Sequence, residues 1–107
     1  MIYFKAVNHE CNLHDEFLSK NTKEALDAFY DYMDLDSIVE DYGYSTQEMK
    51  KFDEALVKLI NNGGLKITDT MTGNHYVIMI NEDLKDNEPQ HSFDLEAEME
   101  DMIDNLF

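Results

Sequence analysis

The chain has 107 residues and a formal net charge of −16 at pH 7, because 24 aspartates and glutamates face only eight lysines and no arginine. So few cations cannot offset repulsion from a polyanion, which argues against direct binding to nucleic acid or to anionic membrane surfaces. The hydrophobic content of 43% is enough to build one folded domain over residues 1–107, which argues against wholesale disorder.

The first predicted elements are a strand and a loop. Residues 1–8 are expected to form a strand because they are rich in β-branched and aromatic side chains. Residues 8–20 are polar and lack a clear period, which predicts a loop containing at most one helical turn, over residues 16–18.

Residues 21–62 are predicted to be a helical region. Two helices begin with capping-box patterns, Asn21 with Glu24 and Ser45 with Glu48, and apolar residues at helical spacing follow each box. A shorter helix is expected between them, and a glycine pair ends the last one.

A hairpin and a terminal helix complete the predicted elements. Residues 65–70 alternate in polarity, residues 75–80 are apolar, and Gly73 between them suits a turn, so a β-hairpin is predicted over residues 65–81. Residues 92–107 are predicted to form a C-terminal acidic helix. Its apolar face carries Leu95, Met99, Met102, Ile103 and Leu106.

These elements occur in the order β-α-α-α-β-β-α. They predict an α+β domain with a small three-stranded, largely antiparallel sheet and helices packed on it. The N-terminal strand is expected to complete the sheet, because an isolated hairpin is only marginally stable in water.

The acidic residues are concentrated in two blocks. The first block, residues 24–41, holds seven acids and no lysine. Its acids are Glu24, Asp27, Asp31, Asp34, Asp36, Glu40 and Asp41. The first four follow one another at spacings of three, four and three, which predicts one helical face with carboxylates roughly 5–6 Å apart along the axis. That spacing is comparable with the separation of phosphates along a nucleic-acid strand.

The second block, residues 82–107, holds ten acids and one lysine, and Asp94, Glu98 and Asp101 are predicted to share a helical face. Residues 45–66, by contrast, hold three acids and four lysines. Like charges at helical spacing cost roughly 0.2–0.5 kcal/mol a pair, so a surface that keeps them is a candidate partner-binding surface. We therefore take the seven acids of the first block and these three of the second as candidate partner-binding residues.

Candidate sites for catalysis or metal binding are weak. His9, Cys11 and His14 offer metal-ligand atoms but at loose spacing, and a fourth ligand would have to come from Asp15, His75 or His91. A Cys11–His14 nucleophile pair lacks an oxyanion turn and an orienting residue. No segment follows the ligand pattern of an EF-hand calcium loop. We therefore expect no catalytic residues, no metal site and no cofactor, and hence no enzyme.

Location is predicted from what the sequence lacks. A single cysteine cannot form an internal disulfide, and no stretch reads as a signal peptide or a membrane span. The cytoplasm is the expected compartment.

Tyrosines accompany the first acid block: Tyr30 and Tyr32 lie within it, and Tyr42 and Tyr44 follow directly after it. The two acid blocks and these aromatic residues together characterise the chain. It resembles, in composition, the small acidic DNA-mimic inhibitors of phages and mobile elements, of the anti-CRISPR and anti-restriction type. The resemblance implies a non-enzymatic inhibitor whose carboxylates occupy the basic nucleic-acid-binding groove of a host nuclease or CRISPR effector, in the host cell cytoplasm if phage-encoded.

Two other functions are left open by the sequence. An immunity protein or antitoxin would neutralise a basic toxin by charge and shape complementarity without imitating a duplex. An acidic regulatory or structural module would have no dedicated basic target. Whether the chain forms a homodimer is also left open.

Overall fold

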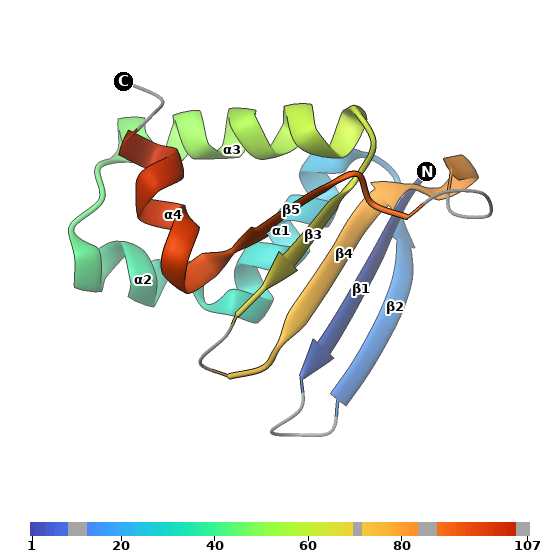
Figure 1. Ribbon diagram of the computed structural model, residues 1–107, viewed down its shortest axis with the longest axis horizontal. Coiled ribbons are helices and arrows are strands. Elements are labelled where there is room, and N and C mark those ends of the chain that lie inside the picture. Colours follow the sequence, from blue (N-terminus) through green and yellow to red (C-terminus); the bar gives the residue numbers. More distant parts are fainter. Residues whose placement is uncertain (9–12, 70–71, 84–87, 105–107) are drawn as a thin grey trace.

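A computed structural model describes residues 1–8, 13–69, 72–83 and 88–104 (Figure 1). The elements in chain order are β1 (Ile2–Asn8), β2 (Leu13–Ser19), α1 (Thr22–Met33), α2 (Leu35–Tyr42), α3 (Thr46–Asn61), β3 (Leu65–Thr68), β4 (His75–Ile80), a short 3-10 helix η1 (Asn81–Asp83), β5 (His91–Asp94) and α4 (Leu95–Asp104).

The sheet is larger than predicted. Five strands form it in the order β2-β1-β4-β3-β5, and all neighbours are antiparallel except the parallel pair β3 and β5. The predicted three-stranded, largely antiparallel sheet is therefore wrong, while the α+β class is confirmed. The predicted hairpin is present as β3 and β4, with Thr68 opposite His75, and β1 joins it by pairing Tyr3 with Met79.

Strand β2 lies where a loop was predicted. Its residues do not alternate between apolar and polar, so the sequence shows no two-residue period. The strand pairs along its length with β1, and it forms one edge of the sheet. An edge strand is partly open to solvent on both faces, so neighbouring Phe17 and Leu18 are both exposed, at 39% and 48%, and polarity does not alternate. Pairing with β1 makes this segment a strand, and a pattern within residues 13–19 cannot reveal that partner.

Strand β5 was predicted as the beginning of the last helix. Its four residues pair in parallel with β3, and only Phe93 among them is buried, packed edge-to-face against Phe52 of α3 at 6.3 Å between ring centroids. The helix therefore begins at Leu95 and not at Ser92. A strand this short carries too few residues to show a two-residue period.

The predicted beginnings of α1 and α3 are confirmed. The Asn21 side chain accepts a hydrogen bond from the Glu24 N–H at 2.9 Å, and a reciprocal capping box joins Ser45 and Glu48. Helix α2 ends at Gly43, whose φ of 70° is accessible to glycine without a side-chain clash.

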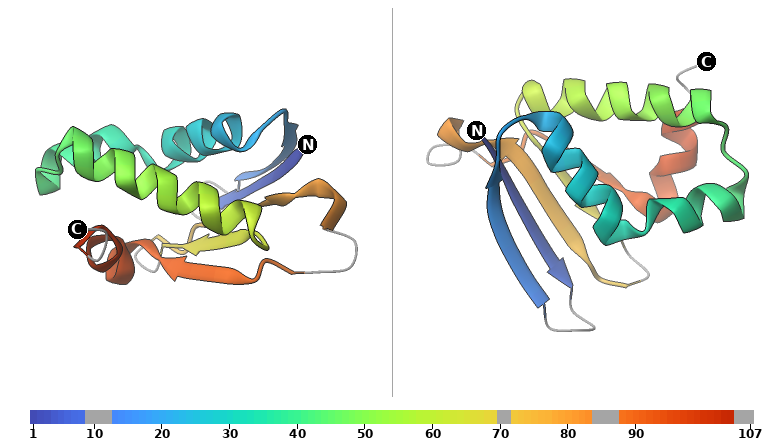
Figure 2. Two further views of the ribbon diagram at one scale, coloured as in Figure 1. Left: turned by 90° about the horizontal axis from the view of Figure 1, so that it is seen from above. Right: turned by 180° about the vertical axis from the view of Figure 1, so that it is seen from behind.

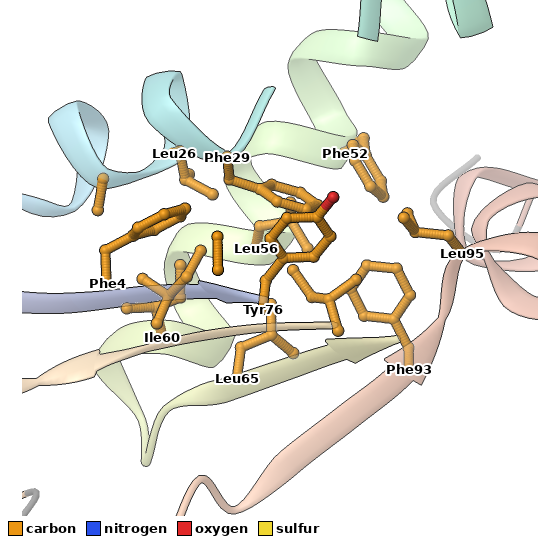
Figure 3. Close-up of a cluster of buried hydrophobic side chains, with 14 of the residues drawn as sticks. Phe4, Leu26, Phe29, Phe52, Leu56, Ile60, Leu65, Tyr76, Phe93 and Leu95 are labelled. Carbon is orange, nitrogen blue, oxygen red and sulfur yellow. The ribbon is translucent and has the colours of Figure 1, made fainter. Parts of the chain in front are cut away.

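Helices α1 and α3 lie over one face of the sheet, whereas α2 and α4 lie beyond its end (Figure 2). The core forms between the sheet and these helices (Figure 3). Its fully buried side chains include Phe4, Leu26, Phe29, Phe52, Leu56, Ile60, Leu65, Ile67 and Ile78. Helix α4 joins this core through the predicted residues Leu95, Met99 and Ile103, all buried, whereas the side chains of Met102 and Leu106 lie outside the described part.

Within the ranges described, the helices are all too short or too polar to cross a lipid bilayer.

Candidate functional site

The acids of the first block begin on the outer side of α1. Glu24, Asp27 and Asp31 are exposed, whereas Leu26 and Phe29 on the same helix are completely buried against the sheet. The helix thus separates its carboxylates from its core face, as the spacing predicted. With a rise of about 1.5 Å per residue, successive carboxylates stand roughly 4.5–6 Å apart along the axis.

Asp34 does not continue this helical face. It lies between α1 and α2 in the left-handed region, with φ of 54°, and its N–H donates to the Asp31 carbonyl at 3.3 Å. Its carboxylate accepts a 2.8 Å hydrogen bond from the Ser37 hydroxyl. The predicted face of four acids therefore ends at Asp31, because the chain turns at Asp34 to begin α2.

Helix α2 carries the rest of the first block. Asp36, Glu40 and Asp41 are exposed, whereas Ile38 and Val39 are half-buried. Asp36 and Glu40 are four residues apart, so they occupy the same side of the helix. Helix α2 is thus amphipathic, with acids outward.

In the second block, Glu98 and Asp101 are exposed on α4, three residues apart. Asp94 was predicted to share their helical face, but it is the last residue of β5 and only partly exposed. The predicted set of three is therefore split between a strand end and a helix.

The two acid blocks, far apart in the sequence, meet at one end of the molecule. Helices α2 and α4 lie at the same end of the ribbon in each view (Figures 1 and 2). Both contribute to one cavity of about 100 Å³. Its lining residues are Met33, Ile38, Tyr42, Tyr44, Asp69, Leu95 and Met99. No pattern in the sequence predicted that α2 and α4 would line one cavity.

The four tyrosines within and directly after the first block divide into two pairs. Tyr30 and Tyr32 are half-buried and donate hydrogen bonds to carboxylates, Tyr30 to Asp53 at 2.8 Å and Tyr32 to Asp15. Tyr42 and Tyr44 stack on each other at the cavity, with ring centroids 5.8 Å apart and planes 19° from parallel. Tyr42 is 63% exposed, so it is the aromatic residue of this region that a partner can contact.

These hydrogen bonds shift the ionisation of the phenols. Burial, together with the bond to Asp53, raises the pKa of Tyr30 far above its ordinary value. The bond to Asp15, with some burial, raises the pKa of Tyr32 to about 12. Asp15 and Asp53 therefore serve the fold, tying α1 to β2 and to α3, a role that their spacing in the sequence did not reveal.

The helical layer is not uniformly acidic. Lys23 lies 3.8 Å from Asp27 and 3.5 Å from Asp53, so it places a cation beside the α1 acids. Lys23 and Lys50 also line a shallow groove between α1 and α3. Lysine is absent from residues 24–49, a stretch that includes Asp31 of α1 and the whole of α2.

The residues weighed for metal binding do not form a site in the described part of the chain. His14 lies 3.1 Å from Glu16 on β2, and His91 lies 3.1 Å from the Asn62 carbonyl. His9 and Cys11 lie outside the described residues. Among those that are described, no three histidine, cysteine, aspartate or glutamate side chains gather in a metal-binding arrangement.

Comparison with known proteins gives no relative: no family model, curated protein or solved structure matches the chain.

Proposed function

We propose that this protein is a non-enzymatic inhibitor that binds the basic nucleic-acid-binding groove of a host nuclease or CRISPR effector, in the manner of a DNA mimic. The supporting observation is the lysine-free run of exposed carboxylates from Asp31 through α2, joined at one end of the molecule by the exposed acids of α4. A field of this sign attracts a groove built to bind phosphates and speeds the encounter with it. The cytoplasm, where such targets act, is the proposed location.

The charge itself supports a role in binding. Like charges on neighbouring helical turns oppose folding, and lysines at some of these positions would have stabilised the helices. Asp31, Asp36, Glu40 and Asp41 are exposed, so their side chains are not needed to fill the core. Their retention is explained if a basic surface complements them in the complex.

The test is inhibition of DNA cleavage, measured on a panel of purified restriction nucleases and guide-loaded CRISPR nucleases. We expect at least one to be inhibited, with inhibition relieved by excess duplex DNA and weakened by salt, because the inhibitor and DNA compete for one groove. An inhibitor that excess DNA cannot displace would contradict mimicry.

A charge-matched pair of variants locates the surface. The first variant carries Asp31→Asn, Asp36→Asn, Glu40→Gln and Asp41→Asn. The control removes four exposed acids elsewhere, Glu54→Gln, Glu82→Gln, Asp83→Asn and Glu88→Gln, so both have a formal charge of −12 (−16 plus 4). Inhibition should fall in the first variant and persist in the control. Equal loss in both would mean that net charge alone, and not this surface, is responsible.

One observation favours the second candidate, an immunity protein or antitoxin that neutralises a basic toxin. The lysine between Asp27 and Asp53 and the turn at Asp34 interrupt the regular spacing of carboxylates, so the surface is not a periodic copy of a phosphate backbone. Complementarity to one toxin surface does not require such a copy. Binding to a basic toxin at a site that its nucleic-acid substrate does not occupy would select this candidate.

A further inference from the structure

The cavity between α2 and α4 has the size of a receptor for one side chain. Its volume of about 100 Å³ is below the roughly 300–1,000 Å³ of pockets that hold cofactors and drug-sized ligands. It corresponds to about three water molecules at their share of liquid volume. A single planar head group is an occupant of suitable size.

Six of the seven residues that line the cavity are apolar or aromatic. Leu95 and Met99 of α4 are buried and also pack in the core, and Figure 3 shows Leu95 pointing toward Phe52. Across the cavity, Tyr42 and Tyr44 present a stacked aromatic pair. The face of a tyrosine ring attracts a cation placed within about 6 Å of its centre, and arginine is the commonest side chain in that position.

Asp69 is the lining residue that carries a formal charge at neutral pH. A turn holds it in place: its backbone N–H donates to the Asn74 carbonyl at 2.9 Å, and its carbonyl accepts from Gly73 at 2.8 Å. The carboxylate accepts from the Thr72 N–H at 3.4 Å. A carboxylate has about four acceptor positions, so it can accept from a guanidinium in addition to the partners it has within the protein.

The charges around the cavity determine which charge its occupant can carry. The helices that form the cavity carry exposed acids, Asp36, Glu40 and Asp41 on α2 and Glu98 and Asp101 on α4. An anion would be repelled by this field, and a neutral apolar group would gain nothing from it. A cation with a flat face is attracted by the field and can also stack on the tyrosine rings.

We propose that this cavity binds one arginine side chain of the basic partner, stacked on Tyr42 and paired with Asp69. The inference rests on the proposed function, since it names the residue by which such a partner is anchored. Arginine fits better than lysine because its guanidinium is planar, stacks on aromatic rings and pairs with carboxylates through two parallel hydrogen bonds. The acids outside attract the groove, and the cavity fixes the register of the complex.

The test uses the isolated protein and three capped glycine-X-glycine peptides in which X is arginine, citrulline or lysine. Citrulline keeps the shape of arginine and loses its charge. NMR of the methionine methyl groups reports the site through Met33 and Met99, and the fold through buried Met79. We expect the arginine peptide to shift the methyl resonances of Met33 and Met99 in a saturable manner and to leave the Met79 resonance unchanged. The inference is overturned if citrulline or lysine binds equally well, or if no saturable shift occurs.

Variants separate the site from general charge. Asp69→Asn should lower the affinity for the arginine peptide about fivefold, which is near the upper limit of what a partly exposed ion pair contributes. Glu54→Gln, which also removes one acid but lies outside the cavity, should bind as the unchanged protein does. Tyr42→Ala should lose binding and Tyr42→Phe should keep it, because phenylalanine retains the aromatic face. If Asp69→Asn disturbs the turn, the Tyr42 pair still decides the matter.

The peptide experiment and the nuclease experiment fail independently. If the arginine peptide binds but no nuclease is inhibited, the cavity is a cation-binding site and the proposed nuclease partner is wrong. Inhibition that survives Tyr42→Ala, with no peptide binding, would overturn the arginine receptor and leave the acidic surface as the binding site.

Discussion

The Tyr30 hydroxyl donates a 2.8 Å hydrogen bond to the Asp53 carboxylate, which ties the acidic helix α1 to α3. Asp53 also lies 3.5 Å from Lys23, so one carboxylate on α3 holds two groups of α1. Near a helix that is crowded with acids, this attachment depends on a neutral phenol and a lysine, neither of which adds to the negative charge.

Tyr30→Phe should therefore lower the free energy of unfolding by about 1 kcal/mol, the net contribution of a typical hydrogen bond. The ring stays, so core packing is kept, and Lys23 still compensates Asp53. Urea denaturation measures the change. Tyr42→Phe, which removes a hydroxyl from an exposed tyrosine, is the matched control and should leave stability unchanged. An equal loss in both variants would contradict a role for the Asp53 bond.

Stability should fall between pH 10 and 12 as tyrosines ionise. Burial and a hydrogen bond to Glu16 raise the pKa of Tyr3 from 10.0 to about 12, and the bond to Asp15 raises that of Tyr32 to about 12. A group whose pKa is higher in the folded than in the unfolded protein stabilises the fold fully below the unfolded pKa, and this contribution is lost as pH rises through the folded pKa. Tyrosinate absorbance and urea midpoints across this range measure both effects.

Tyr3→Phe provides the control for this pH dependence. The hydrogen bond from Tyr3 is the main cause that lowers the pKa of Glu16, so this substitution should raise the Glu16 pKa toward its ordinary value. It should also reduce the alkaline loss of stability. An unchanged Glu16 titration, followed by NMR, would show that the 2.5 Å bond between Tyr3 and Glu16 does not form in solution.

Helix α4 should behave as part of the core. Ile103 is completely buried, so Ile103→Ala should lower the free energy of unfolding by about 3 kcal/mol. Glu98→Ala, on the exposed side of the same helix, should change it by less than about 0.5 kcal/mol. Thermal unfolding compares the two. If neither substitution moves the midpoint, residues 95–104 are an unattached acidic tail and the cavity beside α2 does not exist.

Salt should stabilise the folded protein. Raising sodium chloride from about 10 mM to about 1 M shortens the screening length from roughly 30 Å to 3 Å, which removes most repulsion among exposed carboxylates. The variant with four neutral side chains in place of Asp31, Asp36, Glu40 and Asp41 should unfold at a higher temperature in low salt and gain less from added salt. A midpoint independent of salt in both proteins would mean that these acids do not oppose folding.

Local signals in the sequence were sufficient for the helices. Caps such as Ser45 with Glu48 act over three residues, and the apolar stripes of α1 and α3 repeat often enough to be recognised. Strands β2 and β5 could not be found in this way, because each is defined by a partner elsewhere in the chain. Phe17 of β2 stacks on Phe4 of β1, with ring centroids 4.8 Å apart, and no feature of residues 13–19 alone predicts this contact.

The same distinction applies to the candidate site. Exposure of Glu24, Asp27 and Asp31 follows from helical spacing and was predicted. The break at Asp34 was not, because an aspartate in the left-handed region leaves no pattern in the sequence. The cavity required α2, α4 and Asp69 to meet, and their meeting depends on the parallel pairing of β5 with β3, which determines where α4 begins.

The position of β1 in the sheet means that the sheet can be completed only after β4 has been synthesised. Strand β1 is synthesised before the other strands of its sheet but lies inside the sheet, flanked by β2 and by β4, the latter through the pairing of Tyr3 with Met79. Until β4 is synthesised, β2 is the only strand that β1 can pair with among its two neighbours, and a two-stranded hairpin is marginally stable in water. At roughly 5–20 residues per second, the nascent chain waits several seconds with the apolar side chains of β1 uncovered. Residues 1–74 carry 14 acids and seven lysines, and this net negative charge opposes association of nascent chains before the sheet can close.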